Sequence, residues 1–252
     1  QRAAEEELEN QLRAVEWGAF GRFTGTRYAR GKLTSAEPDY LQGAVVIMDA
    51  RSGAVGALVG GRDFQQSEFD RATRARRQAG SAFKPFVYAA AIEHGYVPSQ
   101  HIADLPIRLE LPGGEVWEPQ NAEGGTEGAV SMRDALVRSK NLPTIRLAAD
   151  VGVDEVISVA RSSGIRSPLP DVPSLAIGTA SVTPLEMTAA YTPFATLGQS
   201  IAPSLIVRVV DAKGDVVWQP GTRRRAVMEP EVAYLITDML SDALRRGTGV
   251  AA

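Results

Sequence analysis

The sequence predicts a layered α/β (α+β) fold, in which an antiparallel sheet packs against helices beside a large helical subdomain. Two observations support this prediction. Val-rich runs joined by turn residues occur as pairs at two places in the chain, which is typical of antiparallel hairpins. Most of the other patterned segments have the apolar spacing of helices. This combination favours an α+β or layered architecture over a doubly wound βαβ sheet.

The first predicted helix spans residues 1–16, where Leu8, Leu12 and Val15 recur at helical spacing. Thr183 followed by Pro184 is a typical helix start, and Gly95 is a typical stop. The other predicted helices span 81–95, 131–137, 153–163, 183–197 and 229–244, and one more begins at 142. The predicted hairpins occupy 43–61, with turn residues at 49–53, and 207–218.

The composition excludes several classes of protein. The 252-residue chain has a net charge of −3, so it shows no electrostatic footprint for nucleic acid. It has no cysteine, and its two histidines, His94 and His101, leave little for a histidine triad or metal site. We expect no metal and no cofactor. The sequence contains no run of about 18 apolar residues, so it predicts no membrane span within this chain.

The first chemical motif is SAFK at residues 81–84. If Ser81 opens a helix, Lys84 lies one turn away on the same face and can take the hydroxyl proton. Burial and a helix N-terminus both lower the pKa of such a lysine. Pro85 limits regular helix upstream of Ser81, and Gly80 allows close approach at the nucleophile. The alternative is a capping Ser and a surface Lys, although Lys84 lies in an otherwise apolar segment.

The second motif is SKN at residues 139–141, between two predicted helices. Ser139 is suited to relay a proton between Lys84 and a leaving group, and Asn141 to hold Lys84 or a substrate amide. The alternative interpretation is an ordinary polar turn between helices, where Ser and Asn are common.

Together the two motifs and their surroundings resemble class A, bifunctional penicillin-binding proteins, which share S-x-x-K and Ser-x-Asn elements with serine β-lactamases. The resemblance extends in the family's order along the whole chain. It is carried by the runs QRAAEEEL, DARSGAVGALVGG, GSAFKPFVYAAAIEHGYVP, WEPQN, ALVRSKNLPTIRLA, LAIGTASVTPLEMTAAYTPFATLGQ and RRGTGVAA.

The resemblance implies a serine-type D-Ala-D-Ala transpeptidase that acts on peptidoglycan stem peptides and is acylated by β-lactams. Ser81 would be the nucleophile, Lys84 its base, Ser139 the proton relay and Asn141 the amide-orienting group. Lys140 is assigned no role. Three further residues are expected to bind substrate: Gly80, Trp117 and Asn121. For Trp117 and Asn121 the alternative role is support of the fold.

The resemblance also implies a domain organisation. Residues 1–42 would be a helix and irregular linker leading into the domain, and residues 43–252 the transpeptidase domain. A glycosyltransferase domain and a membrane anchor are expected on the N-terminal side, with the protein acting outside the bacterial cytoplasmic membrane. The family's K-T-G motif, which binds the substrate carboxylate, does not occur before the chain ends at Ala252. We therefore expect a chain truncated before that motif, incomplete as a fold and as a site.

Two alternative functions stay open at this point. A D,D-carboxypeptidase or serine β-lactamase would use the same Ser81 and Lys84 with water as acceptor. A β-lactamase needs an extra group to activate that water, and none is identifiable in the sequence. A non-catalytic β-lactam sensor or scaffold is the other alternative, because K-T-G is missing.

Overall fold

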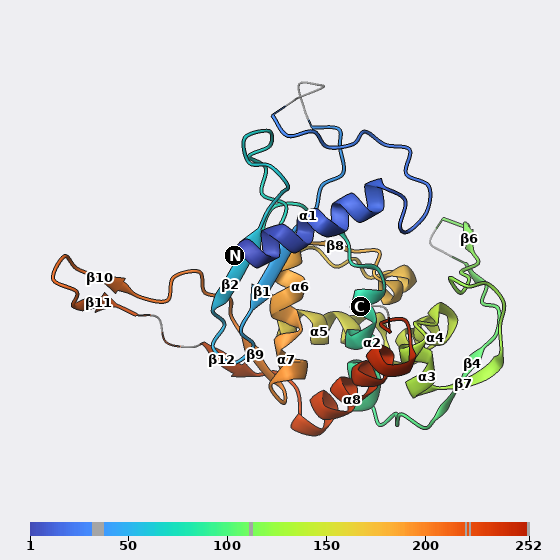
Figure 1. The fold of residues 1–252 in the computed structure, drawn as a ribbon. Helices are drawn as coiled ribbons and strands as arrows, with labels where there is room; N and C mark the ends of the chain where they lie inside the picture. The colour runs from blue at the N-terminus through green and yellow to red at the C-terminus, as the bar shows by residue number, and fades with distance from the viewer. Residues whose placement is uncertain (32–37, 111–112, 220, 222, 251–252) are drawn as a thin grey trace. The chain divides into compact units, whose positions relative to one another are not determined.

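The computed structural model describes residues 1–31, 38–110, 113–219, 221 and 223–250, and it divides into two compact units (Figure 1). The first unit comprises Gln1–Arg77, Val182–Ala189 and Ile201–Arg224, and the second comprises Gln78–Ser181, Ala190–Ser200 and Arg225–Ala252. The described residues form helices and two-stranded sheets, so the predicted mixture of elements is present. Among the described helices, none has the length and apolar character needed to cross a membrane.

The first unit contains the hairpin predicted at residues 43–61. Strand β1 (Val45–Met48) pairs antiparallel with β2 (Val55–Val59), and the register shifts after Ile47. Asp49 closes the turn, because its backbone carbonyl accepts a 2.8 Å hydrogen bond from the N–H of Gly53. Gly53 has a φ of +80°, a conformation that glycine adopts without steric cost.

Helix α1 (Arg2–Glu16) packs on this hairpin through a small apolar core in which Leu8 lies against Ala57 and Val59. The helix is also held by Arg62, which follows β2. The Arg62 guanidinium is 1% exposed and forms ion pairs with Glu9 at 2.7 Å and Glu16 at 2.5 Å. The predicted N-terminal helix is therefore confirmed and is fixed by a buried ionic network.

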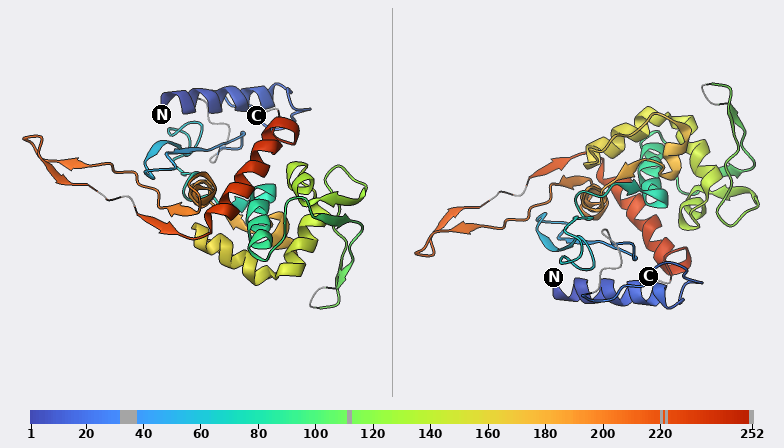
Figure 2. Two further views of the ribbon diagram at one scale, coloured as in Figure 1. Left: turned by 90° about the horizontal axis from the view of Figure 1, so that it is seen from below. Right: turned by 90° about the horizontal axis from the view of Figure 1, so that it is seen from above.

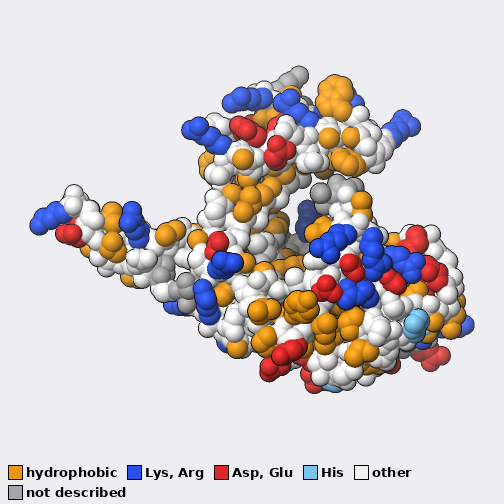
Figure 3. Space-filling model, turned by 60° about the horizontal axis from the view of Figure 1, so that its bottom comes forward, with side chains coloured by type: hydrophobic (Ala, Val, Ile, Leu, Met, Phe, Trp, Pro, Cys, Tyr) orange, Lys and Arg blue, Asp and Glu red, His pale blue; other side chains and the backbone are white. Residues whose placement is uncertain are grey.

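The second predicted hairpin is also present, as β10 (Val209–Val210) paired antiparallel with β11 (Val216–Trp218). Its turn is closed by Asp211, whose carboxylate accepts a 2.8 Å hydrogen bond from the backbone of Lys213. Both strands are exposed, and their apolar side chains are visible as orange patches on the arm at the left of Figure 3.

The second unit is built around helix α2 (Lys84–Glu93), which is buried from Lys84 to Ala91. It packs against α4 (Asn141–Val151), α5 (Val153–Ser163) and α8 (Pro230–Arg246). In both views of Figure 2 the teal α2 lies between the red α8 and the yellow-green α4 and α5. A helix that is apolar all round is expected at such a central position.

Short strands and one short helix lead to the 139–141 turn. Strand β4 (His101–Asp104) pairs antiparallel with β7 (Gly128–Ser131), and β5 (Leu109–Glu110) pairs with β6 (Val116–Trp117). The helix α3 (Met132–Val137) follows β7 directly, and the Ser131 side chain caps its N-terminus. The remaining short elements are η2 (Pro173–Ile177), β3 (Arg77–Gln78), β8 (Ser181–Val182), β9 (Gln199–Ile201) and β12 (Arg224–Ala226).

The helix predicted over residues 81–95 begins differently from the prediction. It starts as a 3-10 helix, η1 (Gly80–Phe83), and becomes α-helical only at Lys84. Pro85 explains the difference, because it lacks an N–H and its ring would clash with the Ser81 carbonyl in an α-helix. That carbonyl accepts instead from the backbone N–H of Lys84. The helix stops as predicted, with Gly95 at a φ of +90°.

The helix predicted over residues 183–197 is divided in two, α6 (Pro184–Ala190) and α7 (Thr192–Ala195). Its start is confirmed, since the Thr183 hydroxyl accepts a 3.2 Å hydrogen bond from the backbone of Glu186. Pro193 accounts for the break, because a proline removes one helical hydrogen bond and clashes with the preceding turn.

Candidate active site

Ser81 lies exposed on η1, one residue after the left-handed Gly80, whose φ is +56°. A 3-10 helix has three residues per turn, so side chains three residues apart lie directly above one another. The 3-10 start therefore places Ser81 and Lys84 on the same side of the chain more directly than an α-helix would. The exposed hydroxyl is accessible, while the amine lies in the interior.

The backbone before Ser81 is fixed to the segment around Gly178. The N–H of Ala79 donates to the carbonyl of Ala180 at 3.1 Å, and the N–H of Gly80 donates to the carbonyl of Gly178 at 2.9 Å. Gly178 has a φ of +79°, and a Cβ there would come within 2.0 Å of the Gly80 carbonyl oxygen. Only glycine at this position allows the two backbone segments to approach so closely.

The backbone after Ser81 is held by Tyr191, a residue that the sequence analysis did not single out. Its hydroxyl donates a 2.6 Å hydrogen bond to the carbonyl of Ala82. Its ring packs edge-on against Phe86 and Phe194. Burial raises the pKa of the Tyr191 phenol, so the proton that makes this hydrogen bond is retained.

Lys84 is 1% exposed, and its amine reaches the 139–141 turn. The Nζ atom donates to the backbone carbonyl of Ser139, to its Oγ at 3.0 Å and to Oδ1 of Asn141 at 2.8 Å. Burial lowers the pKa of Lys84 to about 8, against a smaller opposing effect from the charge of Glu123. The structure therefore brings together Lys84, Ser139 and Asn141, as the two motifs predicted, and lowers the pKa of the amine toward neutral pH.

The 139–141 turn has a backbone that normally favours glycine. Ser139 has a φ of +55°, at the position just past the end of α3. Its N–H donates to the carbonyl of Leu136, and the N–H of Lys140 donates to the carbonyl of Ala135, which is the Schellman pattern of helix termination. A left-handed residue with a side chain costs roughly 1–2 kcal/mol. This conformation turns both oxygens of Ser139 toward the Lys84 amine.

Asn141 has an amide whose orientation is fixed from both ends. Its Oδ1 accepts from Lys84, and its Nδ2 donates a 2.8 Å hydrogen bond to the backbone carbonyl of Gln120. The backbone carbonyl of Gln120 can only accept, so Nδ2 must face it, and Oδ1 therefore faces Lys84.

Asn121 and Trp117, both expected near the substrate, occupy different environments. Asn121 is 4% exposed, and its Oδ1 accepts from the N–H groups of Asn141 at 2.9 Å and Leu142 at 3.2 Å. These are the first two donors of α4, so Asn121 caps that helix from a distant loop. Trp117 is half-buried on β6, opposite Leu109. Of the two roles considered for Asn121, its burial and bonding favour fold support, and substrate contact by either residue stays a prediction.

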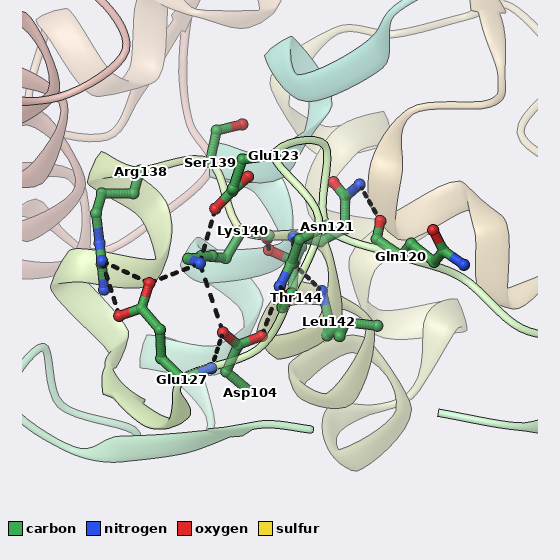
Figure 4. Close-up of polar contacts among 12 residues, drawn as sticks. Asp104, Gln120, Asn121, Glu123, Glu127, Arg138, Ser139, Lys140, Leu142 and Thr144 are labelled. Carbon is green, nitrogen blue, oxygen red and sulfur yellow. Dashed lines mark hydrogen bonds and ion pairs between the residues drawn. The ribbon is translucent and has the colours of Figure 1, made fainter. Parts of the chain in front are cut away.

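Lys140, the residue without an assigned role, is 2% exposed and is surrounded by carboxylates (Figure 4). Its Nζ lies 2.7 Å from Glu123, 2.8 Å from Glu127 and 3.5 Å from Asp104. Burial alone would lower its pKa, but the hydrogen bonds to Glu123 and Glu127 and the charge of Asp104 raise it to about 12. The sequence held one hint of this arrangement: Lys140 is one of only four lysines and follows an acidic loop.

The two lysines of the site thus have opposite properties. Lys84 is surrounded by neutral oxygen atoms and can lose its proton, whereas Lys140 is surrounded by carboxylates and keeps its proton. No group of His, Cys, Asp and Glu suited to a metal ion occurs among the described residues. The arrangement can support nucleophilic attack by a serine whose proton passes to a buried neutral amine.

Comparison with known proteins defines the class to which this fold and site belong. The family model described as the penicillin-binding protein transpeptidase domain matches residues 43–252. The chain therefore belongs to the penicillin-binding protein transpeptidase family, and the resemblance found in the sequence is confirmed.

Within that family the chain matches the transpeptidase domain of class A enzymes of the penicillin-binding protein 1A type. It is 40% identical over 226 residues to penicillin-binding protein 1A of Neisseria lactamica, covering 86% of this chain and 28% of that protein. The crystal structure of penicillin-binding protein 1A from Haemophilus influenzae is similar with a TM-score of 0.80 and 30% identity, over 83% of this chain and 37% of that one.

A third relative was solved with a ligand. The structure of PonA1 from Mycobacterium tuberculosis in complex with penicillin V has a TM-score of 0.67 and 27% identity, over 78% of this chain and 54% of that one. These matches confirm the predicted fold class, a penicillin-binding protein transpeptidase fold. The chain spans less than a third of the length of the curated relatives that it matches.

Proposed function

We propose that this domain is a D,D-transpeptidase that cross-links peptidoglycan stem peptides through an acyl-enzyme on Ser81. One observation carries the proposal. The amine of Lys84 is buried, has a pKa of about 8 and is bonded to Ser139 and Asn141, one 3-10 turn from the exposed hydroxyl of Ser81. Such an amine is a competent base at neutral pH, because about one-tenth of it is neutral at pH 7.

In the acylation step, Oγ of Ser81 attacks the carbonyl carbon of the penultimate D-Ala, and the hydroxyl proton passes to the neutral amine of Lys84. A neutral amine can donate to the Ser139 carbonyl and to Asn141 Oδ1 while its lone pair accepts this proton. The C–N bond then breaks. The terminal D-Ala departs with the proton, which reaches its nitrogen through the Ser139 hydroxyl, and an ester on Ser81 remains.

In the second step, the amine of a neighbouring stem peptide attacks the ester carbonyl. Its proton passes to Lys84 and returns to the Ser81 oxygen as the ester bond breaks, so the site is restored and the new amide is the cross-link. A β-lactam takes the first step alone. Ser81 opens the ring amide, but the leaving nitrogen stays tethered to the acyl group, so the ester persists.

The remaining residues of the site are given supporting roles. Gly80 allows a substrate backbone to pass close to the nucleophile, because it has no side chain and no heavy atom lies near its missing Cβ. Asn121 contacts the backbone of Asn141, while Trp117 lies on β6 and is the one of the two with an accessible side chain for a substrate.

For the whole protein, we propose that residues 43–252 form the transpeptidase domain and that residues 1–42 lead into it. A glycosyltransferase domain and a membrane anchor would precede this chain, and the protein would act on the outer side of the cytoplasmic membrane. Two facts support this: the relatives are penicillin-binding proteins 1A, and this chain covers 28% of the Neisseria protein.

The direct test is labelling with a fluorescent penicillin, using the full-length protein that contains this chain. We expect covalent label that is absent from Ser81→Ala and is released over hours instead of seconds. Rapid release would favour the β-lactamase alternative, and no label on the wild-type protein would favour a non-catalytic scaffold. Incubation with a stem pentapeptide and an acceptor amine then distinguishes a cross-linking enzyme from a carboxypeptidase, which releases D-Ala without forming the new amide.

A further inference from the structure

The 139–141 turn is held by a loop on the side away from the Lys84 amine. The loop consists of residues 118–127, between β6 and β7, and it meets the turn in two places. Glu123 and Glu127 bind the side chain of Lys140, and Asn121 binds the backbone of Asn141. Figure 4 shows these residues converging on Lys140 from the loop and from Asp104 at the end of β4.

Lys140 is the centre of this arrangement. Its side chain is 3% exposed, and that of Asp104 is 0% exposed. Both charged groups are therefore buried, and each is stabilised by the other and by its remaining hydrogen-bond and ion-pair partners. Asp104 is itself bonded to the loop, since its Oδ1 accepts from Asn121 at 2.7 Å and its Oδ2 from the Glu127 backbone at 3.0 Å. Removing the Lys140 charge would leave a buried carboxylate without a cation.

The backbone of Lys140 is also tied to the helical core. Its carbonyl accepts a 2.6 Å hydrogen bond from the Thr144 hydroxyl, and that hydroxyl contacts Tyr88 of α2 at 3.1 Å. Ser139 and Asn141, on either side of Lys140 in the chain, point to Lys84. Lys140 itself has an extended backbone, with a φ of −62° and a ψ of 134°, and side chains alternate in direction along an extended chain. Lys140 therefore faces the loop while its two neighbours face the base.

We propose that Lys140 is a positioning residue of the catalytic turn, which holds Ser139 and Asn141 against Lys84 by binding Asp104, Glu123 and Glu127 behind them. This rests on the proposed function of Ser81 and Lys84. The Lys140 amine touches none of the reacting atoms, and its effect on the reaction is exerted through Ser139 and Asn141. A left-handed Ser139 needs such a restraint, because this conformation is disfavoured for a residue with a side chain.

The test compares acylation by fluorescent penicillin in the full-length protein, normalised to the folded fraction and separated into initial binding and the covalent step. The primary variant is Lys140→Met, which keeps the length of the side chain without its charge. The second is the double variant Glu123→Gln with Glu127→Gln. These carboxylates are 48% and 44% exposed, so the second variant loosens Lys140 without leaving a buried charge unpaired.

Rates are measured above pH 9, where Lys84 is neutral, because Glu123 also affects the pKa of Lys84. We expect the covalent step to slow about tenfold or more in Lys140→Met and severalfold in the double variant, with initial binding little changed. In a Ser139→Ala background the same Lys140→Met change should cost less, because the part of its effect that is exerted through the Ser139 hydroxyl is already lost there.

The matched control is Arg133→Met on the neighbouring helix α3. Arg133 forms ion pairs with Asp238 at 2.6 Å and Asp242 at 2.9 Å, so its loss should lower stability without changing the acylation rate of the folded protein. A wild-type rate in both test variants, or equal losses in the wild-type and Ser139→Ala backgrounds, would overturn the role of Lys140. Failure of the wild-type protein to be labelled would instead overturn the proposed function.

Discussion

At the scale of single residues, the site depends on one amine in an unusual environment. Lys84 is surrounded by oxygen atoms of Ser139 and Asn141, which accept hydrogen bonds but carry no full charge. Neutral acceptors do not compensate for the loss of water around an ammonium group, and the pKa falls. The same residue would be an ordinary cation if a carboxylate replaced either partner.

The pH dependence of acylation follows from this environment. The proposed base, Lys84, would be active when neutral, so the acylation rate should rise with pH through about 8 and level off above it. Lys84→Ala should be folded and should slow acylation severely at every pH. The measurement is the rate of fluorescent penicillin labelling from pH 6 to pH 10, and a rate independent of pH across this range would remove Lys84 as the base.

Ser139 should show opposite effects on stability and on activity. Replacement by Gly relieves the left-handed conformation, so we expect Ser139→Gly to raise the free energy of unfolding by about 1 kcal/mol and to slow acylation. Ser139→Ala separates the two effects, because it removes the hydroxyl and keeps the backbone conformation. Denaturant titration and penicillin labelling measure them, and a destabilised Ser139→Gly would contradict the interpretation of this turn.

At the scale of elements, Ser81, the proposed nucleophile, is positioned by the junction between η1 and α2. Pro85 prevents an α-helical first turn, and the resulting 3-10 turn aligns Ser81 with Lys84. The segment around Gly178 then binds the start of this turn through its backbone. The position of Ser81 therefore depends on these main-chain hydrogen bonds, together with the Tyr191 hydroxyl that binds the carbonyl of the next residue.

Gly178→Ala should disturb this junction directly. The new Cβ would lie 2.0 Å from the Gly80 carbonyl oxygen, so we expect a loss of about 3 kcal/mol in stability and slower acylation in the folded protein. Gly164→Ala is the matched control. Gly164 also has a positive φ, but nothing lies within 4 Å of its missing Cβ. The control should lose less stability and acylate normally, and equal behaviour of the two variants would argue against the packing explanation.

At the scale of the whole molecule, the residues of the site belong to one unit. Ser81, Lys84, Ser139 and Asn141 all lie in Gln78–Ser181, while the helix α1 and its Arg62 network belong to the other unit. The two sets of interactions are therefore expected to be separable by mutation.

Arg62→Met tests this separation. It removes a buried cation from Glu16, which is 3% exposed, so we expect a loss of about 3 kcal/mol and faster hydrogen exchange in α1. Penicillin labelling of the folded protein should be unchanged. Arg13→Met is the control, because Arg13 is 63% exposed and its pairing with Glu9 contributes little. Slower labelling in Arg62→Met alone would show that the unit with α1 influences the site.

Local sequence signals predicted most of the helices and hairpins and the grouping of Lys84 with Ser139 and Asn141, but not the contacts that support this group. The hairpin turn at Asp49–Gly53 and the burial of Lys84 follow from neighbouring residues, and both are confirmed. The partners of Lys140 lie 13 to 36 residues away in the chain, and Tyr191 lies 109 residues from the carbonyl that it binds. Such contacts depend on how the elements pack, and no periodicity or spacing encodes them.

The crossing of Gly80 and Gly178 has a consequence for how this protein can change over time. Two backbone segments meet there with no side chain between them, and a side chain at Gly178 would disturb the position of Ser81, the proposed nucleophile, so this crossing has little room to vary. Variants that escape an antibiotic would have to arise where side chains govern access or the rate of the covalent step. The 118–127 loop and its lysine are such a place, open to gradual adjustment while the attacking oxygen stays where it is.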